Sequence, residues 1–250
     1  MADNFSRCKM KNVLIAFSGK AQSGKTTSAN ILKELILDIQ YKQLKNDPNI
    51  EAVSKQGDSF SIVEKNTTAQ GRVFESPHVQ IHSFATALKE IAVKYFGWDG
   101  DKGIYYVDTA DSGAVDIHGD GQTDAIGSLP IPDKGRQLLI NIGQVFRGIR
   151  PTIWVDYVVN NIKKSSNNLK DKGIVYLIDD MRFRNEIKLC KTFEPCFTVR
   201  ISRPEELHIK DTSEMDLDNE TFDYVLANNG DMEELKNELK KIYDDMLSKI

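Results

Sequence analysis

The chain alternates between short apolar runs and longer stretches whose apolar residues recur at helical spacing. Near-continuous apolar runs of this length are typical of buried parallel strands, and i, i+3, i+4 spacing is typical of helices that cover a sheet. Strands are expected over residues 13–18, 79–84, 174–178, 197–202 and 224–227. Helices are expected over residues 25–44, 86–97, 134–149, 151–162, 185–193 and 232–248. Strand followed by helix, repeated about five times, predicts an α/β fold with three α/β/α layers around a parallel, doubly wound sheet.

Two polar stretches interrupt this pattern, at about residues 46–76 and 101–133. The first is rich in Asn, Ser, Thr and Gln, and we expect a mobile insertion in which 60–63 and 72–74 form a short hairpin. The second is rich in Asp and Gly. Its Asp116, His118, Asp120 and Asp124 superficially resemble calcium ligands, but the EF-hand spacing is absent, which favours a solvated loop. We therefore predict a single domain of residues 1–250 with two insertions.

Composition narrows the functional classes. The net charge of −4 argues against a binder of nucleic-acid polymers, although it allows a local positive site for a nucleotide. The 3 cysteines are scattered and lack metal-ligand spacing, so reduced thiols are expected. No apolar run reaches membrane-spanning length and the N-terminus lacks a signal-peptide core, so we expect a soluble cytoplasmic protein without a membrane partner.

The first expected strand leads directly into a GxxxxGKT motif over residues 19–26. A strand before this motif and a helix after it are the context of a P-loop, in which backbone N–H groups and the helix N-terminus hold a phosphate chain. Lys25 would reach the β- and γ-phosphates, and the Thr26 hydroxyl would bind Mg²⁺. The motif therefore predicts that ATP–Mg²⁺ is bound by the following residues: Gly19, Ala21, Gln22, Ser23, Gly24, Lys25, Thr26 and Thr27.

A P-loop alone does not distinguish a kinase from a GTPase or another ATPase. The turn at 228–231 lacks the lysine of the NKxD guanine-binding motif, which argues against a GTPase. Arginines are frequent near expected strand and helix ends, as phosphoryl transfer between two nucleotides requires; they are Arg136, Arg147, Arg150, Arg182, Arg184, Arg200 and Arg203. Asp179 and Asp180 follow a buried strand, where one would serve the metal and the other the acceptor nucleotide, and the sequence does not order the two. Asp180 could instead cap the next helix.

The order of several motifs resembles the deoxynucleoside monophosphate kinases of tailed bacteriophages, a branch of the P-loop nucleoside monophosphate kinase superfamily. Besides the P-loop, the similar segments are Ser83-Phe84-Ala85 with Leu88-Lys89-Glu90, the segment 96–100, Gly135-Arg136-Gln137-Leu138-Leu139 with Gly143 and Arg147, the segment 179–186 (DDMRFRNE), and Arg203 with 213–214. The sequence departs from the family at 86–87, which is Thr-Ala, and at 144–147. These departures concern base specificity and the acceptor contacts.

The resemblance implies transfer of the γ-phosphate of ATP to a (deoxy)nucleoside monophosphate, with Mg²⁺ as the cofactor. It implies catalytic roles for Lys25, Arg147, Asp180 and Arg182, and metal binding by Thr26 and Asp179. The implied substrate-binding residues are Lys89, Arg136, Arg147, Trp154, Asp180, Arg182 and Arg203, the last as a lid arginine.

Two other interpretations stay open at this point. The same P-loop would serve a kinase for a nucleoside, dephospho-coenzyme A or another small metabolite, or a non-catalytic nucleotide-binding protein whose insertions contact a partner. The sequence does not define the accepted base, the preference for a deoxy sugar or the role of the insertions. Amphipathic helices do not distinguish a homodimer face from a core face. If the protein is viral, the expected compartment is the host cytoplasm.

Overall fold

A computed structural model describes residues 12–65, 72–74, 79–100, 104–105, 131–132, 134–168, 173–203 and 215–250. The chain divides into two compact units, one formed by residues 1–83 together with 158–250 and the other by residues 84–157. The candidate calcium ligands of the second insertion lie outside the described residues. The single domain of residues 1–250 stays a prediction, and each unit is described in turn.

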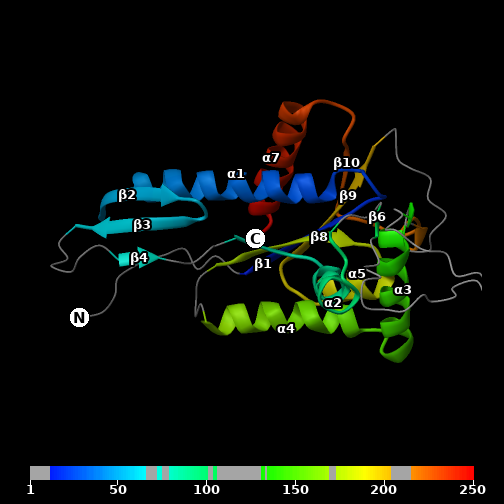
Figure 1. Cartoon of the computed structure of the whole chain (residues 1–250). Helices are drawn as coiled ribbons and strands as arrows, with labels where there is room; N and C mark the ends of the chain where they lie inside the picture. The colour runs from blue at the N-terminus through cyan, green and yellow to red at the C-terminus, as the bar shows by residue number, and fades with distance from the viewer. Residues whose placement is uncertain are drawn as a thin grey trace, which may run out of the picture. The chain divides into compact units, whose positions relative to one another are not determined.

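The first unit is built on a parallel sheet of 5 strands in the order β10-β9-β1-β8-β5 (Figure 1). Its strands are β1 (Val13–Ser18), β5 (Val79–His82), β8 (Val175–Met181), β9 (Cys196–Ser202) and β10 (Tyr224–Ala227). Every neighbouring pair in this sheet runs parallel, and β1 lies in the middle, between β8 and β9. The expected parallel α/β sheet is therefore confirmed, with strand bounds close to those predicted.

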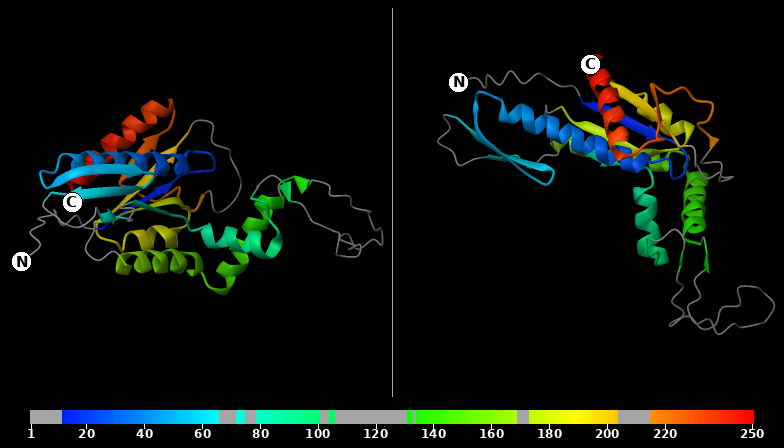
Figure 2. Two further views of the ribbon diagram at one scale, coloured as in Figure 1. Left: turned by 60° about the vertical axis from the view of Figure 1, so that its left-hand side comes forward. Right: turned by 90° about the horizontal axis from the view of Figure 1, so that it is seen from above.

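Helices cover both faces of this sheet (Figures 1 and 2). On one face lie α1 (Lys25–Lys45) and α7 (Met232–Ser248), and on the other lie α5 (Arg184–Cys190) and the part of α4 (Ile153–Asn168) that belongs to this unit. Ile15 and Phe17 of β1 are fully buried in one cluster with Leu32 of α1 and Leu239 of α7. Burying such side chains stabilises the layer by about 1.5–3 kcal/mol each. The three-layer α/β/α architecture follows from these contacts.

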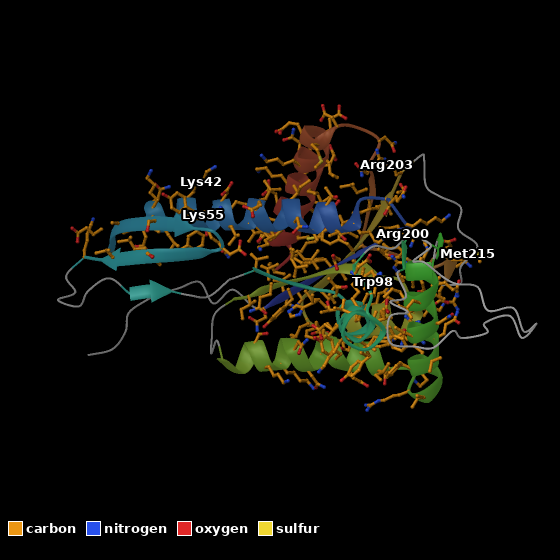
Figure 3. All side chains as sticks on the ribbon, in the orientation of Figure 1. Lys42, Lys55, Trp98, Arg200, Arg203 and Met215 are labelled. Atoms are coloured by element: carbon orange, nitrogen blue, oxygen red, sulfur yellow. The ribbon has the colours of Figure 1, made fainter. Side chains whose placement is uncertain are left out.

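The first insertion is a folded sheet where it is described. β2 (Ile50–Gln56), β3 (Ser59–Glu64) and β4 (Arg72–Phe74) form an antiparallel sheet, of which the sequence indicated only the β3–β4 hairpin. Phe60 is 3% exposed and its ring stacks on Tyr41 of α1, 6.1 Å away. Lys55, which Figure 3 labels beside α1, forms an ion pair of 2.8 Å with Asp38. Residues 50–64 thus form a sheet that packs on α1 through apolar contacts and ion pairs, and the mobility of the insertion stays a prediction.

The second unit contains α2 (Thr86–Phe96), the strand pair β6 (Ile104–Tyr105) and β7 (Ile131–Pro132), α3 (Lys134–Ile149) and the start of α4. Gly97 ends α2 in the left-handed conformation at φ 63°, as the sequence predicts for a helix C-terminus. Helices α2 and α3 pack closely at Gly143, where an added Cβ would approach the Leu88 side chain to 3.1 Å. Among the described residues, no helix is long and apolar enough to cross a membrane.

Candidate functional site

The loop after β1 has the backbone of a phosphate-binding turn. Gly19, Gln22 and Gly24 take positive φ angles of 151°, 63° and 99°. Gly24 is the N-cap of α1, so the loop ends directly at the N-terminus of a helix of 21 residues. Consecutive N–H groups in such a turn converge on one point, and the helix dipole adds positive potential there. This is the geometry that an anion requires.

The loop leaves no room for side chains at the two glycines of the motif, Gly19 and Gly24. A Cβ at Gly19 would lie 2.5 Å from the Ser23 hydroxyl and closer still to the Ile201 carbonyl. A Cβ at Gly24 would lie 2.6 Å from the Asn228 amide nitrogen. The two glycines are therefore required both by their φ angles and by their neighbours.

Lys25, in the first turn of α1, folds back across the loop. Its ammonium donates hydrogen bonds to the carbonyls of Gly19, at 2.7 Å, and Lys20, at 2.6 Å. The side chain is only 7% exposed, so the loop backbone surrounds the charge. A buried ammonium held by carbonyls at this position is suited to meet phosphate oxygens. Thr26 and Thr27, the next two residues, are exposed at the start of the helix.

Residues of β9 and directly after β10 contact the loop and the end of β1 that leads into it. Arg200 of β9 donates a hydrogen bond of 3.0 Å to the hydroxyl of Ser18, the last residue of β1. The Asn228 side chain, directly after β10, donates a hydrogen bond of 2.9 Å to the carbonyl of Ser23. Sequence analysis missed Asn228. Its position after the last parallel strand was a usable signal, because the carboxyl ends of parallel strands meet at one edge.

The two neighbouring carboxylates of the candidate site lie at an irregularity of β8. β1 and β8 pair regularly up to Ala16 and Ile178, and the register then shifts so that Ser18 pairs with Met181. Asp179 and Asp180 occupy this β-bulge, a feature that commonly redirects side chains beside functional sites. Asp180 accepts a hydrogen bond of 2.5 Å from the Ser83 hydroxyl, just after β5. Thus the structure fixes a partner for Asp180 on the adjacent strand.

Asp180 is not the cap of the following helix. The N-cap of α5 is Phe183, and the buried carboxylate of Glu186 accepts the backbone N–H groups of Arg182, at 2.6 Å, and Phe183, at 3.0 Å. The open alternative of a capping role for Asp180 is therefore wrong. Glu186 instead holds the backbone of Arg182 just beyond the end of β8.

An acidic turn over residues 215–220 contacts two of the arginines noted in the sequence. Asp218 forms an ion pair of 2.6 Å with Arg200, whose side chain is 17% exposed. Asp216 and Glu220 contact Arg184, with Glu220 3.2 Å from its Nε. Arg203 is exposed and directly follows the carboxyl end of β9, and Figure 3 labels both Arg203 and Arg200.

The other predicted substrate residues belong to the second unit. Lys89 lines an open hollow of about 590 Å³ along α2, together with Thr86, Glu90, Val93 and Lys94. Arg136 lies half-buried in the first turn of α3. The guanidinium of Arg147 lies over Gly143, where an added Cβ would come within 3.2 Å of its Nη1. A glycine at 143 thus makes room for this arginine.

Trp154 has a packing role within the second unit. Its side chain is 3% exposed, its ring lies 5.6 Å from that of Phe146, and its indole N–H donates to the Gly143 carbonyl at 3.4 Å. A direct contact of Trp154 with a substrate stays a prediction.

His82 ends β5 immediately before Ser83. Its ring is tilted against that of Tyr176, with the centroids 5.9 Å apart. The Nε2 atom is buried without a hydrogen-bond partner among the described residues. Burial lowers the pKa of His82 below its usual value of 6.5, so the imidazole is neutral at neutral pH.

The residues present fit a nucleoside triphosphate with its metal. The glycine cradle, the buried Lys25 and the N-terminus of α1 suit the phosphates. A Thr hydroxyl after the lysine and carboxylates on the neighbouring strand are the oxygen ligands that Mg²⁺ prefers. Within the described residues, no group of three or more His, Cys, Asp or Glu side chains forms a metal site of its own.

The chain matches no protein-family model and no curated protein. Its function therefore has to be inferred from the P-loop and from the residues around it.

Proposed function

We propose that this protein is a (deoxy)nucleoside monophosphate kinase that transfers the γ-phosphate of ATP to a nucleoside monophosphate. The observation that carries the proposal is the loop 19–26 at the carboxyl end of β1, whose glycine conformations and buried Lys25 suit a triphosphate. The β8 end supports it with Asp180 and Arg182, next to β1 in the sheet. The arrangement of motifs similar to phage deoxynucleotide kinases gives the acceptor.

The chemistry needs no nucleophile from the protein. An oxygen of the acceptor phosphate attacks the γ-phosphorus, the bond to the β–γ bridging oxygen breaks, and that oxygen leaves with ADP. The enzyme has to align the two phosphates and neutralise the migrating charge. Lys25 serves the donor phosphates, and Arg182 and Arg147 serve the acceptor and the transferred group.

The acceptor carries negative charge and hydroxyl groups, and the proposed residues match both. Asp180, held by Ser83, offers a carboxylate to a sugar hydroxyl or to a base amine. Arg136, Lys89 and Arg203 provide cations for the acceptor phosphate. Thr26 with Asp179 would hold Mg²⁺, which would supply positive charge to neutralise the phosphates.

The test is a coupled ADP-release assay with ATP–Mg²⁺ and a panel of ribo- and deoxynucleoside monophosphates, nucleosides and dephospho-coenzyme A. We expect turnover with at least one monophosphate and none with the other acceptors. Turnover only with a nucleoside or dephospho-coenzyme A would replace the proposed acceptor class. Tight ATP binding without transfer to any acceptor, by folded protein, would contradict the kinase proposal.

A further inference from the structure

The side chain of Asn228 reaches the P-loop from the opposite end of the chain. Its amide nitrogen lies 2.9 Å from the Ser23 carbonyl oxygen, to which it donates a hydrogen bond. Its backbone N–H donates to the Ser202 carbonyl at 2.8 Å, which continues the β10–β9 ladder by one residue. The amide group is therefore held in place by the central sheet.

The position of this hydrogen bond matters because of the peptide that it contacts. The Ser23 carbonyl and the Gly24 N–H belong to one planar trans peptide, so the two groups point in opposite directions. An anchor on the carbonyl therefore fixes the direction of the Gly24 N–H. Gly24 has φ 99°, and glycine has more backbone freedom than any other residue type. The Ser23–Gly24 peptide therefore needs an external anchor.

The same contact strengthens the donor as well as orienting it. A peptide carbonyl that accepts a hydrogen bond becomes more polarised, and its N–H becomes a better donor. Gly24 is also the N-cap of α1, where N–H groups lack partners within the helix and the helix dipole is positive. An N–H at this point is suited to a phosphate oxygen.

We propose that Asn228 is a positioning residue for the triphosphate, which acts through the Ser23–Gly24 peptide and does not touch the nucleotide itself. The proposal rests on the triphosphate-binding half of the proposed function and not on its acceptor half. It also explains the close contact at Gly24, where a Cβ would come within 2.6 Å of the Asn228 nitrogen. Any side chain at 24 would displace the amide that holds the loop.

The neighbouring residue provides a matched control. Asn228→Asp keeps the shape of the side chain but removes its donor and adds a negative charge. Asn229→Asp adds the same charge one position later, on an exposed residue of the same turn. Asn228→Ala removes the donor without adding charge. Together the three variants separate the hydrogen bond from the charge.

Two measurements test the proposal on the full chain. The first is the affinity for ATP–Mg²⁺ by calorimetry. The second is the ¹⁵N–¹H shift of the Gly24 amide when magnesium tripolyphosphate is added, which a merely structural role of Asn228 would not change. We expect both Asn228 variants to weaken ATP–Mg²⁺ binding by at least about 10-fold, as loss of one hydrogen bond that serves a charged group predicts. In both Asn228 variants, the chemical-shift change of the Gly24 amide should be half that of the wild type or less. The ATP–Mg²⁺ affinity of Asn229→Asp should stay within about 2-fold of the wild type.

The possible outcomes separate this inference from the proposed function. Weakened binding in the Asn228 variants, together with a wild type that phosphorylates no monophosphate, would support the positioning role and refute the kinase. Unchanged affinity and a full Gly24 shift in both variants would overturn the positioning role while leaving the kinase intact. Loss of folding in both variants, measured by thermal unfolding, would also overturn it, because Asn228 would then support the fold and not the loop. A wild type without any Gly24 shift would overturn both proposals.

Discussion

The P-loop of the first unit and the helix surfaces of the second unit use different means to present charge. In the P-loop the determinants are backbone conformations at Gly19 and Gly24, and Lys25 is 7% exposed and donates hydrogen bonds to two carbonyls. In the second unit they are long side chains on helices, such as Lys89 beside an open hollow and Arg147 over Gly143. The first arrangement is encoded by a local motif and held by contacts from Ile201 and Asn228, and the second depends on the packing of helices.

For the proposed kinase, the difference indicates why a sequence motif can encode the binding of the donor phosphates but not the recognition of the acceptor. A phosphate chain is the same in every nucleoside triphosphate, so a rigid backbone cradle can hold it. An acceptor differs in base and sugar, so side chains have to recognise it. Substitutions in the P-loop should therefore have large and unspecific effects, and those in the second unit smaller effects confined to the acceptor.

The sharpest test of the rigid half is Lys25→Ala. We expect kcat to fall by about 10²–10³-fold, because one charge that stabilises the migrating phosphoryl group is lost. The fold should persist, since the hydrogen bonds of this side chain to the Gly19 and Lys20 carbonyls lie within the loop and not in the core. Lys42→Ala, at an exposed position near the end of the same helix, is the matched control and should keep the wild-type rate. Equal rates in both variants would contradict the phosphate role of Lys25.

The role of backbone conformation in the P-loop can be tested by comparing substitutions at Gly24 and Gly57. Gly24→Ala imposes a positive φ on alanine and displaces Asn228, whereas Gly57→Ala imposes φ 59° with nothing within 4 Å. We expect Gly57→Ala to cost about 1 kcal/mol of the free energy of unfolding and Gly24→Ala about 2–3 kcal/mol. Urea unfolding gives both values. Similar costs in the two variants would show that the Gly24 contact is unimportant.

The role of the long side chains in the second unit can be tested with Arg147→Ala. We expect KM for the nucleoside monophosphate to rise by about 10-fold or more, with KM for ATP unchanged, since a charged hydrogen bond is worth about 1.5–3 kcal/mol. Arg150→Ala is the control, because Arg150 is an exposed arginine of the same unit that forms an ion pair with Asp156. A parallel rise in KM for ATP would remove the distinction between the two halves.

The smallest effect is expected in the free energy of unfolding near pH 6, through His82 at the end of the edge strand β5. Burial lowers the pKa of His82 in the folded protein, so the unfolded chain binds the proton first as pH falls below about 6.5. The free energy of unfolding should therefore decrease from pH 6.5 downward, by at most about 1.4 kcal/mol per pH unit from this group. His82→Gln should flatten the slope. An unchanged slope in urea unfolding between pH 7.5 and 5.5 would exclude His82 as its source.

Much of the fold could be predicted because its strands and helices carry strong local patterns. The apolar run 174–178 and the helical spacing of 232–248 correspond to β8 and α7. The β2 strand was missed, because its polar residues gave no alternation and its place depends on contact with α1. Within α7, Tyr243 is buried and Ile242 packs on the same core while partly exposed, and helical spacing alone does not distinguish two such neighbours.

The residues of the candidate site also divide into those that a local motif predicted and those that only the fold brings to the site. The glycines and Lys25 were predicted because a P-loop is a local motif with one geometry. Asn228 and Ser83 were not predicted as partners of the site, because each meets its acceptor far away in the sequence. The irregularity at 179–180 also has no sequence signal, and the partner of Asp180 became clear only from its hydrogen bond with Ser83.

The hydrogen bond from Asn228 to Ser23 spans 205 positions of the chain, which has a consequence for biosynthesis. β1 emerges from the ribosome first, yet both of its sheet neighbours, β8 and β9, follow only after residue 174. At about 5–20 residues per second, β1 waits roughly 10–30 s for its partners and longer for Asn228. A nascent chain thus carries the complete P-loop motif well before its central sheet can form, and the apolar residues of β1 lack their sheet partners during that time.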